Sequence, residues 1–146
     1  MTLYDFYIKW IETHLKLSDW FVELGLRIKS SENEWIFKRN EFYMPRKASE
    51  EILKHRKESE IHLSIARYFD PWDETSPVVY PWIVLDIDVD DPSKGKDVKH
   101  AIVNSLKQQG IVPVVVRTSN GRYHIYVLLS TPIDESDAVH VAKSIL

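Results

Sequence analysis

The sequence contains no cysteine, which excludes a disulfide-stapled scaffold, a cysteine-ligated zinc or iron–sulfur centre and a thiol nucleophile. It has only 4 glycines and 7 prolines, too few for a collagen-like or low-complexity chain. No apolar run reaches the ~20 residues of a membrane helix, and the N-terminus lacks a basic region followed by an apolar signal core. These absences predict a soluble, cytoplasmic protein with no membrane partner.

The residues that are present are typical of a folded domain. The 146 residues are 44% hydrophobic and 28% charged, with a formal net charge of −3, which excludes wholesale disorder. Residues 38–57 hold seven basic and three acidic side chains, whereas residues 69–97 hold two basic and eight acidic ones. This asymmetry suits a polyphosphate or nucleic-acid ligand, although two solvated faces of opposite charge would give the same pattern.

The first half of the chain predicts an α/β lobe over residues 1–79, from apolar residues at helical spacing followed by β-rich runs. In order, the predicted elements are a helix over 3–15, an extended segment over 20–43 divided by a polar turn at 30–33, a short helix begun by Ser49 and ending near Lys57, a strand over 61–68 and a loop over 70–77.

The second half predicts a β-α-β-β-α unit over residues 80–146. In order, its predicted elements are a strand over 80–90, a turn over 91–96, a helix begun by Asp97 and ended by Gly110, strands over 111–119 and 123–129 joined by a tight turn at Asn120-Gly121, and a helix capped by Asp134. This order is that of a split βαβ unit without its last strand. We therefore predict an α+β fold, an antiparallel RRM-like (ferredoxin-like) unit that is incomplete at the C-terminus and packed with the N-terminal α/β lobe.

Three carboxylates share one face of the first strand of this unit. Alternation places Asp86, Asp88 and Asp90 opposite an apolar face. Neighbouring like charges destabilise a strand, but carboxylates about 6–7 Å apart can converge on a hard divalent cation. Their oxygens suit Mg²⁺ or Mn²⁺. We predict that Asp86 and Asp88 bind the metal, and that Asp90 and Asp91 begin a turn.

A second polar group is predicted at the hairpin that joins the last two strands. Arg117 and Ser119 are placed on one strand face, Asn120-Gly121 permits a sharp turn, and His124 opens the next strand. A cation, a hydroxyl, a glycine turn and an imidazole together suit a phosphate. The topology makes the strand of His124 adjacent to that of the aspartates, so we expect the imidazole and the acid pair to face one cavity.

These motifs resemble the catalytic core of the archaeo-eukaryotic primase superfamily. That group includes the small subunits of archaeal and eukaryotic primases, plasmid primase-polymerases and polymerase domains of bacterial end-joining ligases. Leu85-Asp86-Ile87-Asp88 resembles its first motif, hydrophobic-Asp-hydrophobic-Asp, and residues 119–127 resemble its second, Ser-Gly-Arg-Gly-x-His. Residues 38–43 and 62–71 are similar to strands that precede the first motif, so the likeness covers roughly residues 35–130.

The resemblance implies a nucleotidyltransferase that makes primers on a single-stranded DNA template during replication, with Asp86 and Asp88 as catalytic ligands of Mg²⁺ or Mn²⁺. The residues expected to hold the phosphates of a nucleoside triphosphate are Ser119, His124, Arg117 and Arg122. The residues expected to face the template are Lys38, Arg39, Arg46 and Lys47. A helicase or a large primase subunit is the protein partner that the resemblance suggests.

The sequence departs from the family pattern in three ways. The third motif, an acid on a later strand, has no counterpart, since Asp134 and Asp137 are interpreted as helix caps. The glycines that flank the family's arginine are partly replaced around Arg122, and a zinc-binding insertion is absent, as in the plasmid and ligase-associated branches. The missing third acid predicts binding of metal and nucleotide with poor or no polymerisation.

Two other functions are compatible with the same residues. A non-catalytic module that binds single-stranded nucleic acid would stack bases on Tyr123 and Tyr126, although the acidic strand repels a phosphate backbone unless a metal neutralises it. A metal-dependent nuclease or phosphatase also uses paired aspartates. Shortened oligonucleotides or free phosphate, in place of elongated primers, would identify the latter.

Overall fold

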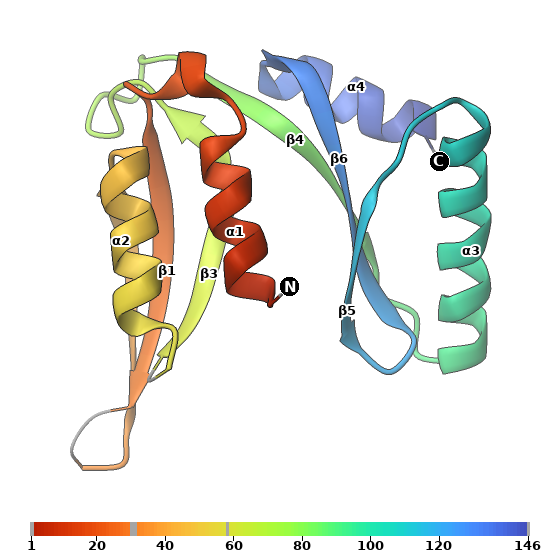
Figure 1. The fold of residues 1–146 in the computed structure, drawn as a ribbon, viewed down its shortest axis with the longest axis horizontal. Coiled ribbons are helices and arrows are strands. Elements are labelled where there is room, and N and C mark those ends of the chain that lie inside the picture. The colour runs from red at the N-terminus through yellow and green to blue at the C-terminus, as the bar shows by residue number, and fades with distance from the viewer. Residues whose placement is uncertain (1, 30–31, 58, 146) are drawn as a thin grey trace. The chain divides into compact units, whose positions relative to one another are not determined.

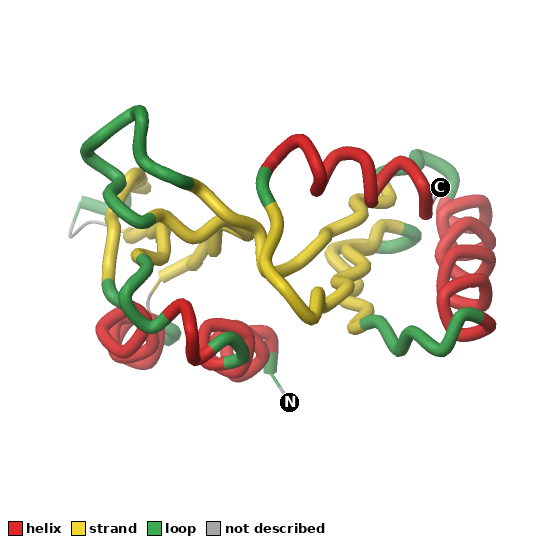
Figure 2. Tube along the Cα trace, turned by 90° about the horizontal axis from the view of Figure 1, so that it is seen from above, coloured by secondary structure: helices red, strands yellow, loops and turns green. Residues whose placement is uncertain are grey.

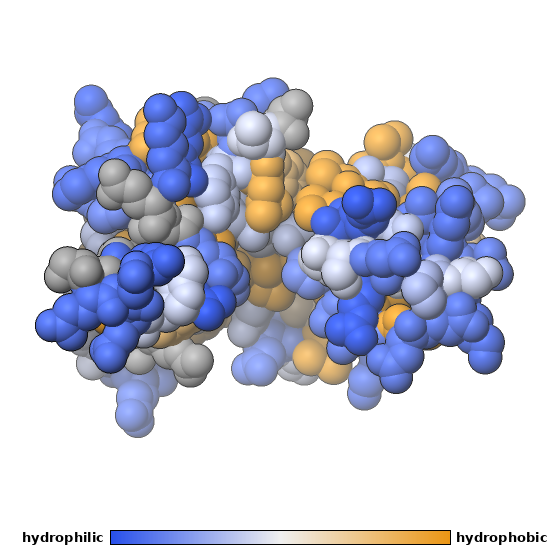
Figure 3. Space-filling view, turned by 90° about the horizontal axis from the view of Figure 1, so that it is seen from below, coloured by the Kyte–Doolittle hydropathy of each residue, from blue (hydrophilic) through white to orange (hydrophobic). Residues whose placement is uncertain are grey.

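The computed structural model describes residues 2–29, 32–57 and 59–145, apart from the side chains of Leu15, Ile28, Arg39, Asn40 and Ser59. The chain divides into two compact units, residues 1–79 and 80–146. Each combines helices with antiparallel strands (Figure 1), which confirms the predicted α+β class. In each unit, hydrophilic side chains make up most of the face seen in Figure 3. No described helix has the length and apolar character needed to cross a membrane.

Helix α1 (Leu3–Glu12) begins the first unit, as the apolar spacing predicted. A capping box starts it: Asp5 N–H donates to Thr2 Oγ1 at 3.1 Å, and Thr2 N–H donates to the Asp5 carboxylate at 3.4 Å. Helix α2 (Pro45–His55) contacts α1, and the two lie on the same side of the strands (Figure 2).

The sheet of the first unit has three strands, and the middle one is antiparallel to both neighbours. The strands are β1 (Phe21–Lys29) in the middle, β2 (Trp35–Tyr43) and β3 (Ser59–Tyr68). Alternate residues of β1, namely Val22, Leu24 and Leu26, are buried, because they point to the side that α1 and α2 cover. Neither helix of this unit covers the other side. The predicted strands of this half are confirmed.

Helix α2 begins four residues before the predicted cap. Pro45 occupies its first position, where a fixed φ and a missing N–H are tolerated, and Met44 precedes it without a side-chain cap. Ser49 instead lies inside the helix, where it is buried and its hydroxyl has no hydrogen-bond partner. The prediction that Ser49 starts the helix was wrong because the proline marks the start.

The second unit has three strands and two helices. They are β4 (Val78–Ile87), α3 (Pro92–Gln108), β5 (Val114–Ser119), β6 (Arg122–Ile133) and α4 (Glu135–Ile145). Strand β6 lies between β4 and β5 and is antiparallel to both. The chain order is the predicted ferredoxin-like β-α-β-β-α. Gly110, with φ of +78°, follows α3, and the Asp134 carboxylate accepts from the Asp137 N–H at 2.8 Å at the start of α4, both as predicted.

Helix α3 begins five residues earlier than predicted, at Pro92. Asp91 caps it, because its carboxylate accepts from the Ser93 N–H at 2.9 Å. Asp97 lies inside the helix and is exposed, so the prediction that Asp97 caps α3 was wrong. A proline again occupies the first helical position, in a segment that was expected to be a turn.

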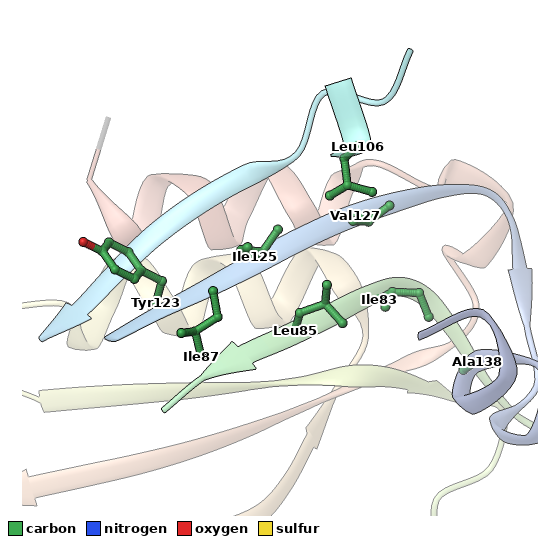
Figure 4. Packing of buried hydrophobic residues seen from close by; sticks show 8 residues of the cluster. All are labelled: Ile83, Leu85, Ile87, Leu106, Tyr123, Ile125, Val127 and Ala138. Atoms are coloured by element: carbon green, nitrogen blue, oxygen red, sulfur yellow. The ribbon is translucent and has the colours of Figure 1, made fainter. Parts of the chain in front are cut away.

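The core of the second unit lies between the sheet and the two helices (Figure 4). Its buried members are Ile83, Leu85 and Ile87 of β4, Tyr123, Ile125 and Val127 of β6, Leu106 of α3 and Ala138 of α4. Fully burying an aliphatic side chain stabilises the folded chain by about 1.5–3 kcal/mol. Burial of this cluster therefore determines which face of each strand the helices cover. The residues that alternate with these positions consequently lie on the face that neither helix of the unit covers.

Candidate metal and nucleotide site

Three aspartates alternate with the buried residues at the end of β4. Asp86 lies within the strand, whereas Asp88 and Asp90 follow it, because β4 ends at Ile87, three residues before the predicted end. The side chains of Asp86 and Asp88 are 65% and 63% exposed. Both carboxylates are therefore open to solvent and not held in a dry interior.

His124 lies directly across from Asp86 in the antiparallel pairing of β4 with β6. Its Nε2 atom is 3.5 Å from Asp86 Oδ1, and its Nδ1 atom is 3.2 Å from the Tyr126 hydroxyl oxygen. The two contacts engage both ring nitrogens, which fixes the orientation of the imidazole. The structure thus brings the acid and the imidazole together on one face.

Tyr126 belongs to this group, on the same face of β6 as His124. It is 4% exposed and packs edge-on against Trp82, with 6.4 Å between the ring centroids. The period-two spacing of the two residues predicts the shared face, but not the contact between the hydroxyl and the imidazole. Burial also shows that base stacking on Tyr123 and Tyr126 was a wrong prediction, because Tyr123 is a member of the core.

Arg122 holds the other two carboxylates. Its Nε atom is 3.1 Å from Asp88 Oδ1, and its Nη2 atom is 3.1 Å from Asp90 Oδ1. Ion pairs this exposed contribute about 0.2–1 kcal/mol each. An anion of higher charge, such as a phosphate, can therefore replace the two carboxylates as the partner of the guanidinium. The sequence reasoning assigned Arg122 to phosphate and missed its contacts with the acids.

The pairing of β5 with β6 places Ser119 and Arg117, the two remaining predicted phosphate ligands, on opposite faces of the sheet. Ser119 pairs with Arg122 and Arg117 pairs with Tyr123, with a shift in register between the two pairs. Paired residues of antiparallel strands share a face, so Ser119 lies on the side of Arg122, and Arg117 on the core side. The interpretation that Arg117 and Ser119 share a face was wrong because a bulge-like irregularity lies between them.

Two glycines pack the tip of this hairpin against the start of α3. A Cβ atom on Gly95 would lie 1.8 Å from the carbonyl oxygen of Gly121, and one on Gly121 would lie 2.3 Å from the Pro92 Cα atom. Gly121 also has φ of +75°. Only glycine fits such positions, and their contact keeps Arg122 close to the segment that carries Asp88.

The four basic residues predicted to contact a template lie on two elements of the first unit. Lys38 is an exposed residue of β2, and the side chain of Arg39 lies outside the described part of the structure. Arg46 and Lys47 lie in the first turn of α2 and form ion pairs of 3.5–3.9 Å with glutamates of the same helix. The helix therefore neutralises part of their charge itself.

The donor set suits a hard divalent cation that keeps other ligands of its own. Within the described ranges, no group of three or more His, Asp or Glu residues is arranged to hold a metal. Mg²⁺ is commonly held by one or two carboxylates together with waters and substrate phosphates. The exposed Asp86 and Asp88 fit an ion of this kind, which would compete with Arg122 for Asp88.

Comparisons with known proteins bear on the fold. No family model and no curated protein matches the sequence. The structure is similar to that of the polymerase domain from Mycobacterium tuberculosis Ligase D in complex with DNA, with a TM-score of 0.60 and 15% sequence identity over 98% of this chain. The present chain spans 60% of the length of that chain. The similarity shows that the two share a fold.

Proposed function

We propose that this chain is the catalytic core of a primase- or polymerase-type nucleotidyltransferase, a class of enzyme that extends or initiates primers on a single-stranded DNA template in replication. The observation that carries the proposal is the meeting of Asp86 with His124 on the face of β4 and β6 that α3 and α4 do not cover, next to Asp88. The fold shared with a polymerase domain supports it.

Asp86 and Asp88 are the proposed catalytic residues and the ligands of Mg²⁺ or Mn²⁺. An ion held there would supply Lewis-acid stabilisation of phosphoryl oxygens and would lower the pKa of an attacking hydroxyl. Both carboxylates are more than half exposed, which leaves room for the phosphate oxygens of a nucleoside triphosphate.

The phosphates are proposed to be held by Ser119, His124 and Arg122. A hydroxyl and a protonated imidazole each donate one hydrogen bond toward an oxygen, and a guanidinium offers five donors in a fork that matches phosphate. Arg122 holds Asp88 and Asp90 in the absence of such an anion. Arg117 has no part in this proposal because its register places it on the core side.

The template is proposed to follow the basic residues of the first unit, namely Lys38, Arg39, Arg46 and Lys47, through phosphate contacts that weaken with salt. A helicase or a large primase subunit is proposed as the partner that presents the strand. The described residues offer no group of three acidic or imidazole ligands, so we expect this chain to bind metal and nucleotide with weak or no primer extension.

Titration with Mn²⁺ tests the proposal, followed by calorimetry and by paramagnetic line broadening in NMR spectra. We expect Mn²⁺ to broaden the signals of His124 and Tyr126 first, and a nucleoside triphosphate to tighten Mn²⁺ binding. The double variant Asp86→Asn, Asp88→Asn should lose this binding. The matched control is Asp97→Asn, Glu135→Gln, which removes the same charge from two exposed positions of the same unit and should bind as the wild type does.

Two results would contradict the proposal. The first is Mn²⁺ binding that is equal in the double variant and the wild type. The second is salt-sensitive affinity for single-stranded DNA that neither a chelator nor Asp86→Asn changes, which would identify a non-catalytic binding module.

A further inference from the structure

The bare side of the first unit's sheet contains a hollow of about 270 Å³. Its polar and aromatic lining consists of Glu23 and Gly25 of β1, Phe37 of β2, and His62 and Ser64 of β3. Pockets for drug-sized ligands are usually about 300–1,000 Å³, so this one is suited to a single small ring system. None of these residues takes part in the function proposed above.

Gly25, which has no side chain, forms part of the floor of the hollow. Gly25 pairs with His62 on one side, and on the other side the register with β2 shifts between Leu24 and Leu26. A Cβ atom on Gly25 would lie 3.5 Å from both His62 Cβ and Phe37 Cζ, which is ordinary contact, and the residue has no positive φ. Close packing therefore does not require this glycine. Glycine within a strand often marks a place where a ligand approaches the backbone.

Two aromatic rings form the walls above this floor. The centroids of Phe37 and His62 are 5.6 Å apart, with 48° between the ring planes. His62 Nε2 lies 3.0 Å from Glu60 Oε1, which holds the imidazole in place. Phenylalanine and histidine rings are among the side chains on which proteins stack unpaired bases. The walls are thus suited to a flat aromatic ligand.

A carboxylate supplies the polar end of the hollow. The Tyr68 hydroxyl hydrogen-bonds with both Glu23 and Ser64, and burial raises the pKa of Tyr68. The phenol is therefore neutral at physiological pH and donates to Glu23. A carboxylate has about four acceptor positions, so one donor from Tyr68 leaves capacity for a ligand that presents adjacent N–H groups.

We propose that this hollow binds one unpaired nucleobase of a single strand, and that it favours guanine. The base would stack on the open side of the Phe37 ring, with the edge of His62 beside it, and direct its ring N–H and exocyclic amino group to Glu23. An arginine side chain of a basic peptide offers similar donors and planarity. The base is favoured because a purine covers more of the two aromatic rings and of the hollow of about 270 Å³ than a guanidinium does; the charge of Arg27, on the same side of the sheet, is already paired with Glu60 at 3.2 Å.

Chemical-shift mapping with nucleosides tests this proposal, with a chelator present so that no metal contributes. We expect guanosine to shift the signals of Phe37 and His62 and to bind about tenfold more tightly than adenosine, the size of effect that a two-point contact with a base gives. Inosine, which lacks the exocyclic amino group, should bind with intermediate affinity. The variant Glu23→Gln should lose the preference for guanosine, whereas the control Glu41→Gln, whose residue pairs with the buried Leu24, should keep it.

A second variant distinguishes guanosine binding in the hollow from nonspecific binding elsewhere on the surface. Gly25→Ala should remain folded, because the added methyl makes only ordinary contacts, and should weaken guanosine binding at least tenfold by filling the floor. Asp86→Asn, Asp88→Asn should leave guanosine binding unchanged, so this proposal and the proposed function can fail separately. Absence of shifts at millimolar guanosine, unchanged binding by Gly25→Ala, or tighter binding of a blocked arginine than of guanosine would each overturn it.

Discussion

The two units have the same arrangement of strands and helices, but they differ in the sheet face that their own helices do not cover. In each, three antiparallel strands are covered on one side by two helices of that unit. In the first unit, Gly25 leaves an open hollow between aromatic rings. In the second, Gly95 and Gly121 bring two backbone segments into contact, and the charged groups meet at 3.1–3.5 Å. A missing side chain thus lies at an open hollow in one unit and at a close backbone contact in the other.

The interiors differ as well. Among the described residues, the buried polar or charged ones are Ser49, Glu51 and Arg67, all in the first unit. The buried cluster of the second unit contains only apolar side chains and one tyrosine. The stability of the first unit therefore depends partly on hydrogen bonds and charge, whereas that of the second depends on close packing.

The largest expected effect is on stability, when a glycine of each unit is replaced by alanine and the two variants are compared. Gly95→Ala should destabilise the second unit by about 3 kcal/mol or more, because its methyl would overlap the Gly121 carbonyl. Gly25→Ala should change stability by less than about 1 kcal/mol, because a strand tolerates alanine where there is space. Denaturant unfolding followed by circular dichroism measures both. Equal stabilities for the two variants would contradict the close packing described for the second unit.

Removal of the buried guanidinium should have the next largest effect. Arg67 is 3% exposed, burial lowers its pKa, and its Nη2 group donates to the Ile11 carbonyl at the end of α1. Arg67→Ala should cost about 2–4 kcal/mol, through a cavity and an unsatisfied carbonyl. The control Arg56→Ala removes an exposed cation of the same unit and should cost less than about 1 kcal/mol. Thermal unfolding compares the two, and similar losses would show that burial of Arg67 does not matter.

Tyr126→Phe should weaken metal and nucleotide binding about tenfold, the lower end of the effect of removing a group that orients a ligand. The substitution removes the hydroxyl next to His124 Nδ1 and keeps the ring against Trp82. The NMR signal of His124 Nδ1 should move as well, because that atom loses its contact with the hydroxyl. Tyr43→Phe in the first unit is the control. Unchanged affinity and an unchanged Nδ1 signal would show that Tyr126 has no role in the site.

Arg122→Ala should raise the affinity for Mn²⁺ about two- to fivefold at low salt, because two exposed ion pairs no longer occupy the acids. The same variant should bind nucleoside triphosphate more weakly, since a phosphate donor is lost. Arg27→Ala, which breaks an exposed ion pair of 3.2 Å in the first unit, should change neither affinity. Calorimetry measures both ligands, and a loss of Mn²⁺ affinity in Arg122→Ala would contradict the competition.

The smallest expected effect concerns the first turn of α1. Hydrogen bonds with Thr2 lower the pKa of Asp5, so its carboxylate stabilises the folded chain above the ordinary pKa of about 3.9 and loses that contribution as the pH falls through the lower, folded value. Thr2→Ala should return the pKa of Asp5 toward its ordinary value in an NMR titration. The difference in stability between Thr2→Ala and the wild type should shrink in acid, and a constant difference would contradict the role of the carboxylate.

The sequence predicted correctly those features that depend on the alternation of residues along a strand or on the order of strands and helices in the chain. Period-two spacing predicted the strands, and topology predicted that Asp86 and His124 would meet. Both errors in helix starts, at Pro45 and Pro92, arose because a proline after a polar or flexible segment indicates a turn as readily as a first helical position.

The remaining features depend on contacts between distant segments, which spacing along one strand does not reveal. The register shift near Arg117 follows from how β5 pairs with β6, and the ion pairs of Arg122 depend on the packing of the hairpin against α3. The hollow above Gly25 needs side chains from three strands at once. Each of these is a property of strand pairing in the folded chain.

The contact between Gly95 and Gly121 also constrains how related sequences can vary. A relative with a side chain at position 95 needs a different turn at positions 120–121, and an insertion in that turn needs a rearranged helix start. The two positions should therefore change together among homologues. Because the acids and Arg122 flank this contact, such paired changes would alter the distances between Arg122 and the carboxylates while the charged residues themselves stay the same.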